Sequence, residues 1–177
     1  MSQRIAFLAR PAPAGDARDA PLAFEDFFEA ERVRLHGALC LVTRNRHEAE
    51  ELSQDAFLKV WESWDRVSRM NDPTGYLYRT AMNAFRSRYR RAALGLKRRL
   101  GLPRIDDGLA AVEERAAIVA ALAHLSEKQR AAVVLTDLLG FSSEESGAIL
   151  GLTPGAVRTL ASRARSELGR RMGDHDA

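Results

Sequence analysis

The residues best suited to binding a charged ligand lie in the segment 142–168, where arginines alternate with small and hydroxyl-bearing side chains. Thr153 and Pro154 are a typical N-cap and first helical residue, so we expect a helix to begin here. At helical spacing, Val157 faces inward and Arg158 faces outward. A helix that enters the DNA major groove, about 12 Å wide, must be slim and must carry hydrogen-bond donors. The residues that meet this requirement are Thr153, Gly155, Ala156, Arg158, Thr159 and Ser162, while Arg163 and Arg165 are better placed for phosphates.

A shorter helix is expected directly before this one. Ser142 and Glu145 have the spacing of a capping box, and Gly151 supplies the left-handed residue that a sharp turn requires. Two short helices joined by a glycine-containing turn, the second with a basic outer face, have the layout of a helix-turn-helix. The alternative is an ordinary helical hairpin with a solvated basic face. In either case the inward stripe of the second helix is Val157, Leu160, Ala161, Ala164 and Leu168.

A second basic cluster combines arginines with aromatic residues. No acidic residue occurs between Asp72 and Asp106, a stretch in which arginines and tyrosines are interleaved. Proteins hold single-stranded or opened nucleic acid with cationic side chains along its backbone and aromatic rings stacked on its bases. The alternatives are a solvated charged face and aromatic rings that belong to the core. We expect Phe85 and one of the tyrosines to be buried.

The helix that precedes this cluster has an acidic outer face. Asn45 and Glu48 resemble a capping box, which predicts that the helix begins near residue 46. Carboxylates on its outer face would repel phosphate, so this face favours a protein partner with a basic docking surface. The alternative is a solvated helix start that the helix dipole stabilises. Its apolar stripe is expected to be Ala49, Leu52, Ala56, Val60 and Trp64, with Phe57 and Trp61 beside it.

Composition excludes several other classes of protein. The 177 residues carry a net charge of +3, and the single cysteine rules out a disulfide framework and a cysteine-cluster zinc site. The four histidines show no metal-ligand spacing, and no phosphate-binding glycine loop occurs. Cys40 lies among aliphatic residues, which favours a buried apolar role over a nucleophile. We therefore expect a cytoplasmic protein without membrane insertion, catalytic activity, cofactor or metal.

The chain is predicted to be all-α, with two small helical domains joined by a flexible linker. No segment shows the strict alternation of a strand. Asp72 and Pro73 predict a helix that ends near Arg91, and Ser126 with Gln129 predicts another that ends at Gly140. A linker of about 20 residues spans about 25 Å as a coil and up to about 65–70 Å when it is extended. The expected units are a disordered lead-in at 1–22, a first domain at 23–91, the linker at 92–111, a second domain at 112–172 and a tail at 173–177.

These patterns together resemble a known family. The segment AEELSQDAFLKVW (49–61) followed by GYLYRTAMNAFRSRYRR (75–91) is similar to region 2 of the sigma-70 family. The segment 121–168 is similar to its region 4. A chain with only these two regions resembles the extracytoplasmic-function (ECF) sigma factors. The resemblance implies a transcription initiation factor that binds core RNA polymerase and directs it to promoters.

The resemblance also implies roles for individual residues. The acidic helix would dock on the β′ clamp helices of RNA polymerase through Glu50, Glu51, Gln54, Asp55 and Leu58. The following basic helix would read the melted −10 element through Tyr76, Arg79, Asn83, Arg86 and Arg90. The helix-turn-helix would read the −35 element as duplex, near the β flap of the polymerase. An anti-sigma factor is a further implied partner.

Some residues depart from the family pattern. Ser87 stands where the family often has an aspartate, and Ser143 where it often has an aromatic residue. Ser146 and Gly147 replace an apolar–alanine pair, so the helix that contains them either packs unusually closely or is marginal until bound. Two other functions remain open at this point: a stand-alone helix-turn-helix regulator that binds duplex DNA without polymerase, and a helical protein-binding adaptor.

Overall fold

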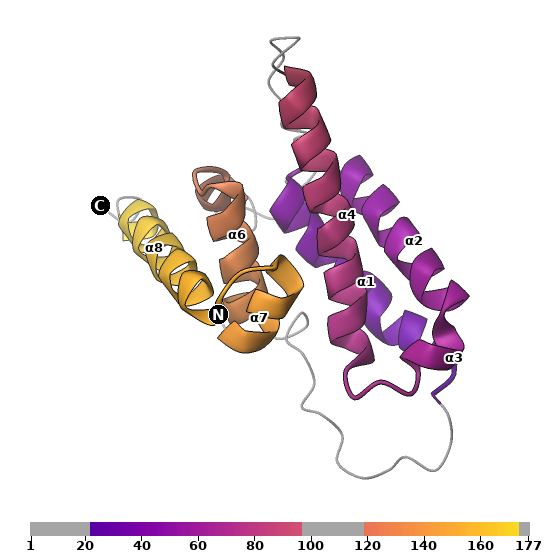
Figure 1. Cartoon of the computed structure of the whole chain (residues 1–177). Helices are drawn as coiled ribbons and strands as arrows, with labels where there is room; N and C mark the ends of the chain where they lie inside the picture. Colours follow the sequence, from indigo (N-terminus) through magenta and orange to yellow (C-terminus); the bar gives the residue numbers. More distant parts are fainter. Residues whose placement is uncertain (1–21, 97–118, 174–177) are drawn as a thin grey trace.

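The computed structural model describes residues 22–96 and 119–173, and within these ranges the regular structure is entirely helical (Figure 1). Nearly all of the expected lead-in, most of the expected linker and the end of the tail lie outside the described residues. The prediction of an all-α chain is confirmed. The helices, in chain order, are α1 (Phe24–Thr43), α2 (Arg46–Glu62), α3 (Trp64–Val67), α4 (Pro73–Leu96), α6 (Glu127–Val133), the π-helical segment η1 (Val134–Leu138), α7 (Ser143–Leu150) and α8 (Pro154–Gly173).

The first helical group contains α1 to α4. Its second helix begins at Arg46 as predicted, because the Asn45 side chain accepts a hydrogen bond from the Glu48 amide at 3.1 Å. The stripe from Ala49 to Val60 is buried against α1 and α4. Trp61 is the exception: it was expected beside the core, but its side chain is 59% exposed. The sequence period places it between the buried and exposed faces of α2, and the structure puts it on the exposed one.

Helix α4 begins where Asp72 and Pro73 predict, since the Asp72 carboxylate accepts a hydrogen bond from the Gly75 amide at 2.9 Å. Phe85 is buried, and Tyr78 is the tyrosine that joins it in the core. The predicted end at Arg91 is wrong, because α4 continues to Leu96. The added turn contains good helix formers, alanine and leucine, which outweigh the cost of about 1 kcal/mol for one glycine.

The second helical group contains the helical residues 119–123 and the elements from α6 to α8. Two capping boxes are complete in this group: Ser126 with Gln129 starts α6, and Ser142 with Glu145 starts α7. The helix after Ser126 ends before Gly140, which has a positive φ of 73°. Its last five residues form the π-helical segment η1, which the sequence pattern did not predict.

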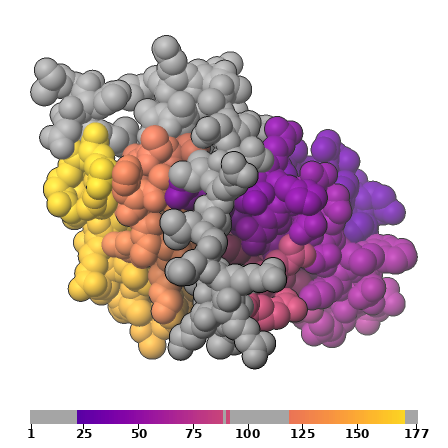
Figure 2. Space-filling view, turned by 90° about the horizontal axis from the view of Figure 1, so that it is seen from above, coloured from indigo at the N-terminus to yellow at the C-terminus, as the bar shows by residue number. Residues whose placement is uncertain are grey.

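The two helical groups pack against each other rather than lying apart on a tether. Figure 1 places α6 and α7 between α8 and the helices α1 and α4, and Figure 2 shows the same two groups side by side from above. Helix α4 contacts α7, and α1 contacts α6 and η1. Tyr78 of α4 meets Phe141, which precedes α7, with ring centroids 5.2 Å apart. Buried residues of both groups therefore form one continuous apolar core.

Candidate functional site

The turn between α7 and α8 has the tight geometry expected of a helix-turn-helix. Gly151 adopts a φ of +64°, and its amide donates to the Gly147 carbonyl. Gly147 itself is buried, and a Cβ added there would lie 2.7 Å from the Leu152 carbonyl oxygen. Of the two interpretations left open for this glycine, close packing is confirmed. Thr153 caps α8 by accepting from the Ala156 amide at 3.3 Å.

Helix α8 carries the predicted recognition residues on one outward face. Val157, Ala161 and Ala164 are buried beneath it, as predicted. Two ion pairs hold arginines on this face: Arg158 with Glu144 at 3.4 Å, and Arg165 with Asp137 at 3.0 Å. Both pairs are solvent-exposed, so each contributes little to stability and is easily exchanged for another anion. Ala156 is half-buried, and the exposed members of the set are Thr153, Gly155, Arg158, Thr159, Ser162, Arg163 and Arg165.

The second predicted nucleic-acid surface lies along α4. Three exposed side chains share one face of this helix: Arg79, Asn83 and Arg90. Asn83 follows one helical turn after Arg79, and Arg90 follows two turns after Asn83. Tyr76 is half-buried: its hydroxyl accepts from Arg66 at 2.9 Å, and the Arg66 guanidinium lies 5.2 Å from the ring centroid. One side of this ring is thus already covered by a cation.

Arg86, the fifth member of this set, points at the other helical group. Its guanidinium donates to the Leu150 carbonyl at the end of α7 and to the Asn83 side-chain oxygen. Burial lowers the pKa of the Arg86 guanidinium, and the charge of Arg90 lowers it further. The structure therefore brings Tyr76, Arg79, Asn83 and Arg90 together and turns Arg86 away from solvent toward α7.

The predicted docking residues all lie on the exposed side of α2: Glu50, Glu51, Gln54, Asp55 and Leu58. Sequence reasoning missed their partner, Arg88 of α4, which donates to Glu51 at 2.6 Å and to Asp55 at 2.9 Å. The hydrogen bond with Glu51 raises the pKa of the Arg88 guanidinium. The positions are 37 and 33 residues apart, so no local spacing could have revealed the pairs.

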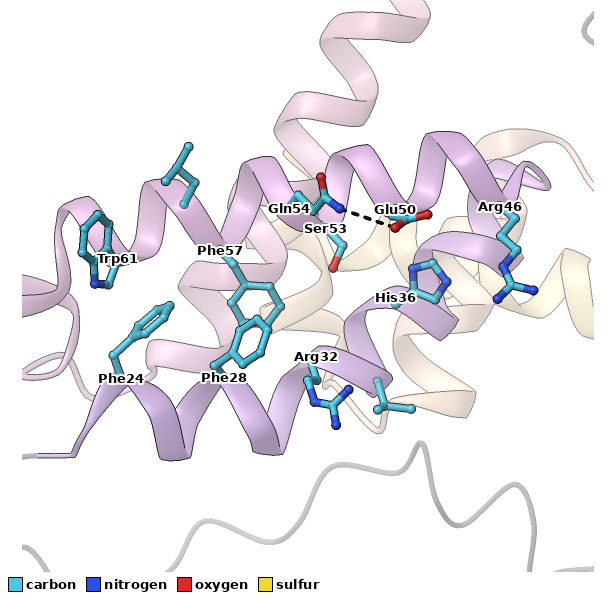
Figure 3. Close-up of a pocket in the computed structure, with 12 residues that line it drawn as sticks. Phe24, Phe28, Arg32, His36, Arg46, Glu50, Ser53, Gln54, Phe57 and Trp61 are labelled. Atoms are coloured by element: carbon cyan, nitrogen blue, oxygen red, sulfur yellow. Dashed lines mark hydrogen bonds between the residues drawn. The ribbon is translucent and has the colours of Figure 1, made fainter.

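An open groove of about 690 Å³ runs between α1 and α2 beside these acids (Figure 3). Its lining is mostly apolar, and Leu58 and Trp61 remain 54% and 59% exposed there. Glu50 and Gln54 lie on the α2 side of the groove, where the Gln54 amide donates to Glu50 at 3.5 Å. The acidic face thus continues into an uncovered apolar surface, a combination that is typical of sites for a protein partner.

The cysteine of the chain is buried near the end of α1. Burial raises the pKa of the Cys40 thiol, which lies 3.4 Å from the His36 ring nitrogen, so the unreactive thiol form is favoured. In the described ranges, no three histidine, cysteine or carboxylate side chains gather where they could hold a metal. The helices in those ranges are also too short or too polar to span a bilayer.

Comparison with known proteins agrees with this geometry. Residues 27–94 match the model of sigma-70 region 2, and residues 115–168 match that of sigma-70, region 4. The chain is 32% identical over 152 residues to the ECF RNA polymerase sigma factor SigM of Mycobacterium tuberculosis, covering 85% of this chain and 78% of SigM. It belongs to the ECF sigma factors. The RNA polymerase sigma factor CarQ of Myxococcus xanthus is 33% identical, over 86% of this chain and 90% of its own.

Solved structures show the same fold. The sigma factor RpoE of Bartonella quintana, crystallised with the anti-sigma factor NepR, superposes with a TM-score of 0.73 at 24% identity, over 85% of this chain and 96% of its own. CnrH, in complex with the cytosolic domain of CnrY, gives 0.60 at 26% identity, over 87% and 89%. This sigma factor therefore has the helical architecture of its family. The comparisons support a function as an RNA polymerase sigma factor. A stand-alone regulator is not favoured.

Proposed function

We propose that this sigma factor docks on core RNA polymerase through the acidic face of α2 and the adjoining apolar groove. The observation that carries the proposal is the combination, on one chain, of exposed carboxylates beside uncovered Leu58 and Trp61 with a separate exposed basic helix. A repressor that acts alone has no use for the first surface. A partner with a basic and partly apolar docking surface would complement it, and the family resemblance points to the β′ clamp helices of the polymerase.

The promoter is read by the two other surfaces. The outward face of α8 enters the major groove of the −35 element, with Arg158 and Thr159 at base edges and Arg163 and Arg165 at phosphates. The face of α4 that carries Arg79, Asn83 and Arg90 holds the melted −10 strand, together with Tyr76 and Arg86. When the promoter is bound in this way, the β flap of the polymerase lies near the helix-turn-helix.

The protein initiates transcription without catalysing a reaction itself, and it acts in the cytoplasm, where the polymerase is. The sigma factor RpoE was crystallised with the anti-sigma factor NepR, and CnrH was solved in complex with the cytosolic domain of CnrY. We propose that the present chain also has an anti-sigma partner. This partner would bind the chain while the polymerase is not bound to it.

Charge reversal on α2 tests the docking surface. The double change Glu51→Lys and Asp55→Lys places two cations beside Arg88 and opposite a basic partner, so co-purification with core polymerase should be lost. Reversing Glu25 and Asp26, which are exposed in the first turn of α1, is the matched control and should leave co-purification intact. Equal retention of polymerase by both variants would remove α2 from the interface.

Run-off transcription on a genomic promoter library tests the function as a whole. Addition of the purified chain to core polymerase should produce initiation at a defined set of promoters. Gel shifts on the same promoters, with and without core polymerase, separate the alternatives. A complex that forms equally well without polymerase, and no selective run-off product with it, would identify a stand-alone regulator instead.

A further inference from the structure

Helix α1 carries two ion pairs of the same spacing, one exposed and one buried. Glu29 and Arg32 lie 2.8 Å apart on the exposed side of the helix. Glu31 and Arg34 lie 3.5 Å apart, and their side chains are only 6% and 9% exposed. Thr74, the second residue of α4, donates its hydroxyl hydrogen to Glu31 at 3.3 Å. The buried pair is therefore joined to the start of α4.

Stability alone does not account for a buried ion pair. Removing two charges from water costs free energy that their mutual attraction only partly returns, and apolar side chains of similar volume often serve as well. The pair does supply direction, because one oxygen of Glu31, Oε1, lies beside Arg34 Nη1 and also accepts from Thr74. The guanidinium thus orients the carboxylate, and the carboxylate orients the hydroxyl of Thr74.

The residues around Thr74 transmit its position along the first turn of α4. The Asp72 carboxylate accepts from the Gly75 amide at 2.9 Å, and the Asp72 carbonyl accepts from the Tyr76 amide at 3.2 Å. Gly75 is so closely covered that an added Cβ would overlap the Asp72 carboxylate. At its other end, Tyr76 accepts from Arg66 at 2.9 Å through its hydroxyl. Tyr76 is therefore held through its backbone and through its ring, and a shift at Thr74 would reach it directly.

We infer that Glu31 and Arg34 are positioning residues for promoter opening. Through Thr74 they fix the first turn of α4, and with it the ring of Tyr76, at the place where the separated −10 strand binds. Stacking of a base on an aromatic ring requires that ring to be set in orientation, and a supporting layer of buried hydrogen bonds provides this. The inference rests on the proposed function, because it takes the melted strand as the ligand of this part of α4.

Substitutions of Thr74 test the inference without removing a buried charge. Thr74→Val keeps the shape of the side chain but cannot donate to Glu31, whereas Thr74→Ser keeps the hydroxyl. Each full-length variant is bound to core polymerase, and unpaired thymines in the −10 element are measured by their permanganate reactivity. Thr74→Val should lower the equilibrium constant of opening by roughly tenfold, about the effect of one lost hydrogen bond to a charged group. Thr74→Ser should restore it.

Two further variants complete the experiment. Thr80→Val is the matched control, since it removes a hydroxyl that bonds within α4 itself, to the Tyr76 carbonyl at 2.8 Å, and it should leave opening unchanged. Glu31→Met combined with Arg34→Met exchanges the buried pair for apolar side chains of similar length. This double variant should lose opening as Thr74→Val does, while its co-purification with core polymerase is retained.

Urea titrations and co-purification with core polymerase accompany every variant, so that loss of the fold or of docking is separated from loss of opening. The inference is overturned if Thr74→Val opens promoters as well as the unaltered chain does, or if Thr74→Ser opens them no better than Thr74→Val. It is also overturned if Thr74→Val loses docking in the same proportion as opening. Absence of reactive thymines with the unaltered chain would overturn the proposed function, and this inference with it.

Discussion

At the scale of single residues, Arg158 is the side chain whose role in promoter reading can be measured most directly. It is exposed at the start of α8, and its pair with Glu144 at 3.4 Å is weak enough to be released at little cost. Arg158→Ala should reduce −35-dependent run-off transcription by a factor that corresponds to about 1–3 kcal/mol, the value of a bidentate contact to a base edge.

The comparison promoter decides what Arg158 contacts. A loss confined to promoters with an intact −35 element indicates a base edge, whereas an equal loss on scrambled −35 sequences indicates a phosphate. Arg171→Ala is the control, because this exposed arginine at the far end of α8 bonds to Glu167 at 2.8 Å and lies outside the recognition set. Its transcription should match that of the unaltered chain on both promoters.

At the scale of helices, the helix-turn-helix depends on a glycine inside α7. Alanine is normally the better helix former by about 1 kcal/mol. At Gly147, however, the added Cβ would press on the Leu152 backbone carbonyl, which can move only if the turn moves. Gly147→Ala should therefore lower the free energy of unfolding by about 1–2 kcal/mol, as overpacked sites do.

The control for this substitution is Gly169→Ala in α8, where nothing lies within 4 Å of an added Cβ. That variant should be neutral or slightly more stable, because only the helix propensity changes. Urea titrations followed by circular dichroism compare the two. If Gly147→Ala were as stable as Gly169→Ala, the close approach at this turn would not constrain the fold.

Helices and their ends could be predicted from the sequence because their causes are local. Asp72, Ser126, Ser142 and Thr153 cap helices through bonds to amides three residues away. Local rules also predicted the outward face of α8. They failed for the end of α4, where alanine and leucine continue the helix to Leu96, and for η1, whose π turn no sequence pattern indicated.

Partners distant in sequence could not be predicted in the same way. Arg88 was one basic residue among many in the sequence, and only the packing of α4 on α2 places it against Glu51 and Asp55. Arg86 was predicted as a nucleic-acid contact from its helix, and its bond to Leu150, 64 positions away, depends on how the two helical groups meet. The sequence therefore predicted the acidic face but not the arginine that pairs with it. It predicted the basic face but not the carbonyl to which one of its arginines is bound.

At the scale of the whole molecule, one core extends through both helical groups, so the described chain should unfold as a unit. Arg130 is a residue that joins the two groups from a buried position. It is 8% exposed and bonds to the carbonyls of Val42, Leu122 and Leu125, the first in one group and the others in its own. Removing its guanidinium leaves buried carbonyls without these bonds.

Arg130→Ala should therefore lower the free energy of unfolding by about 2–5 kcal/mol, within the range for a disrupted buried network. It should also split a single urea transition into two, because the first helical group retains its own core of α1, α2 and α4 whereas α6 loses its anchor to α1. Circular dichroism of the full chain measures both effects. Lys128→Ala, an exposed neighbour on α6, should change the midpoint little and keep one transition. A single transition of unchanged slope in Arg130→Ala would show that the apolar contacts between the groups suffice to couple them without this arginine.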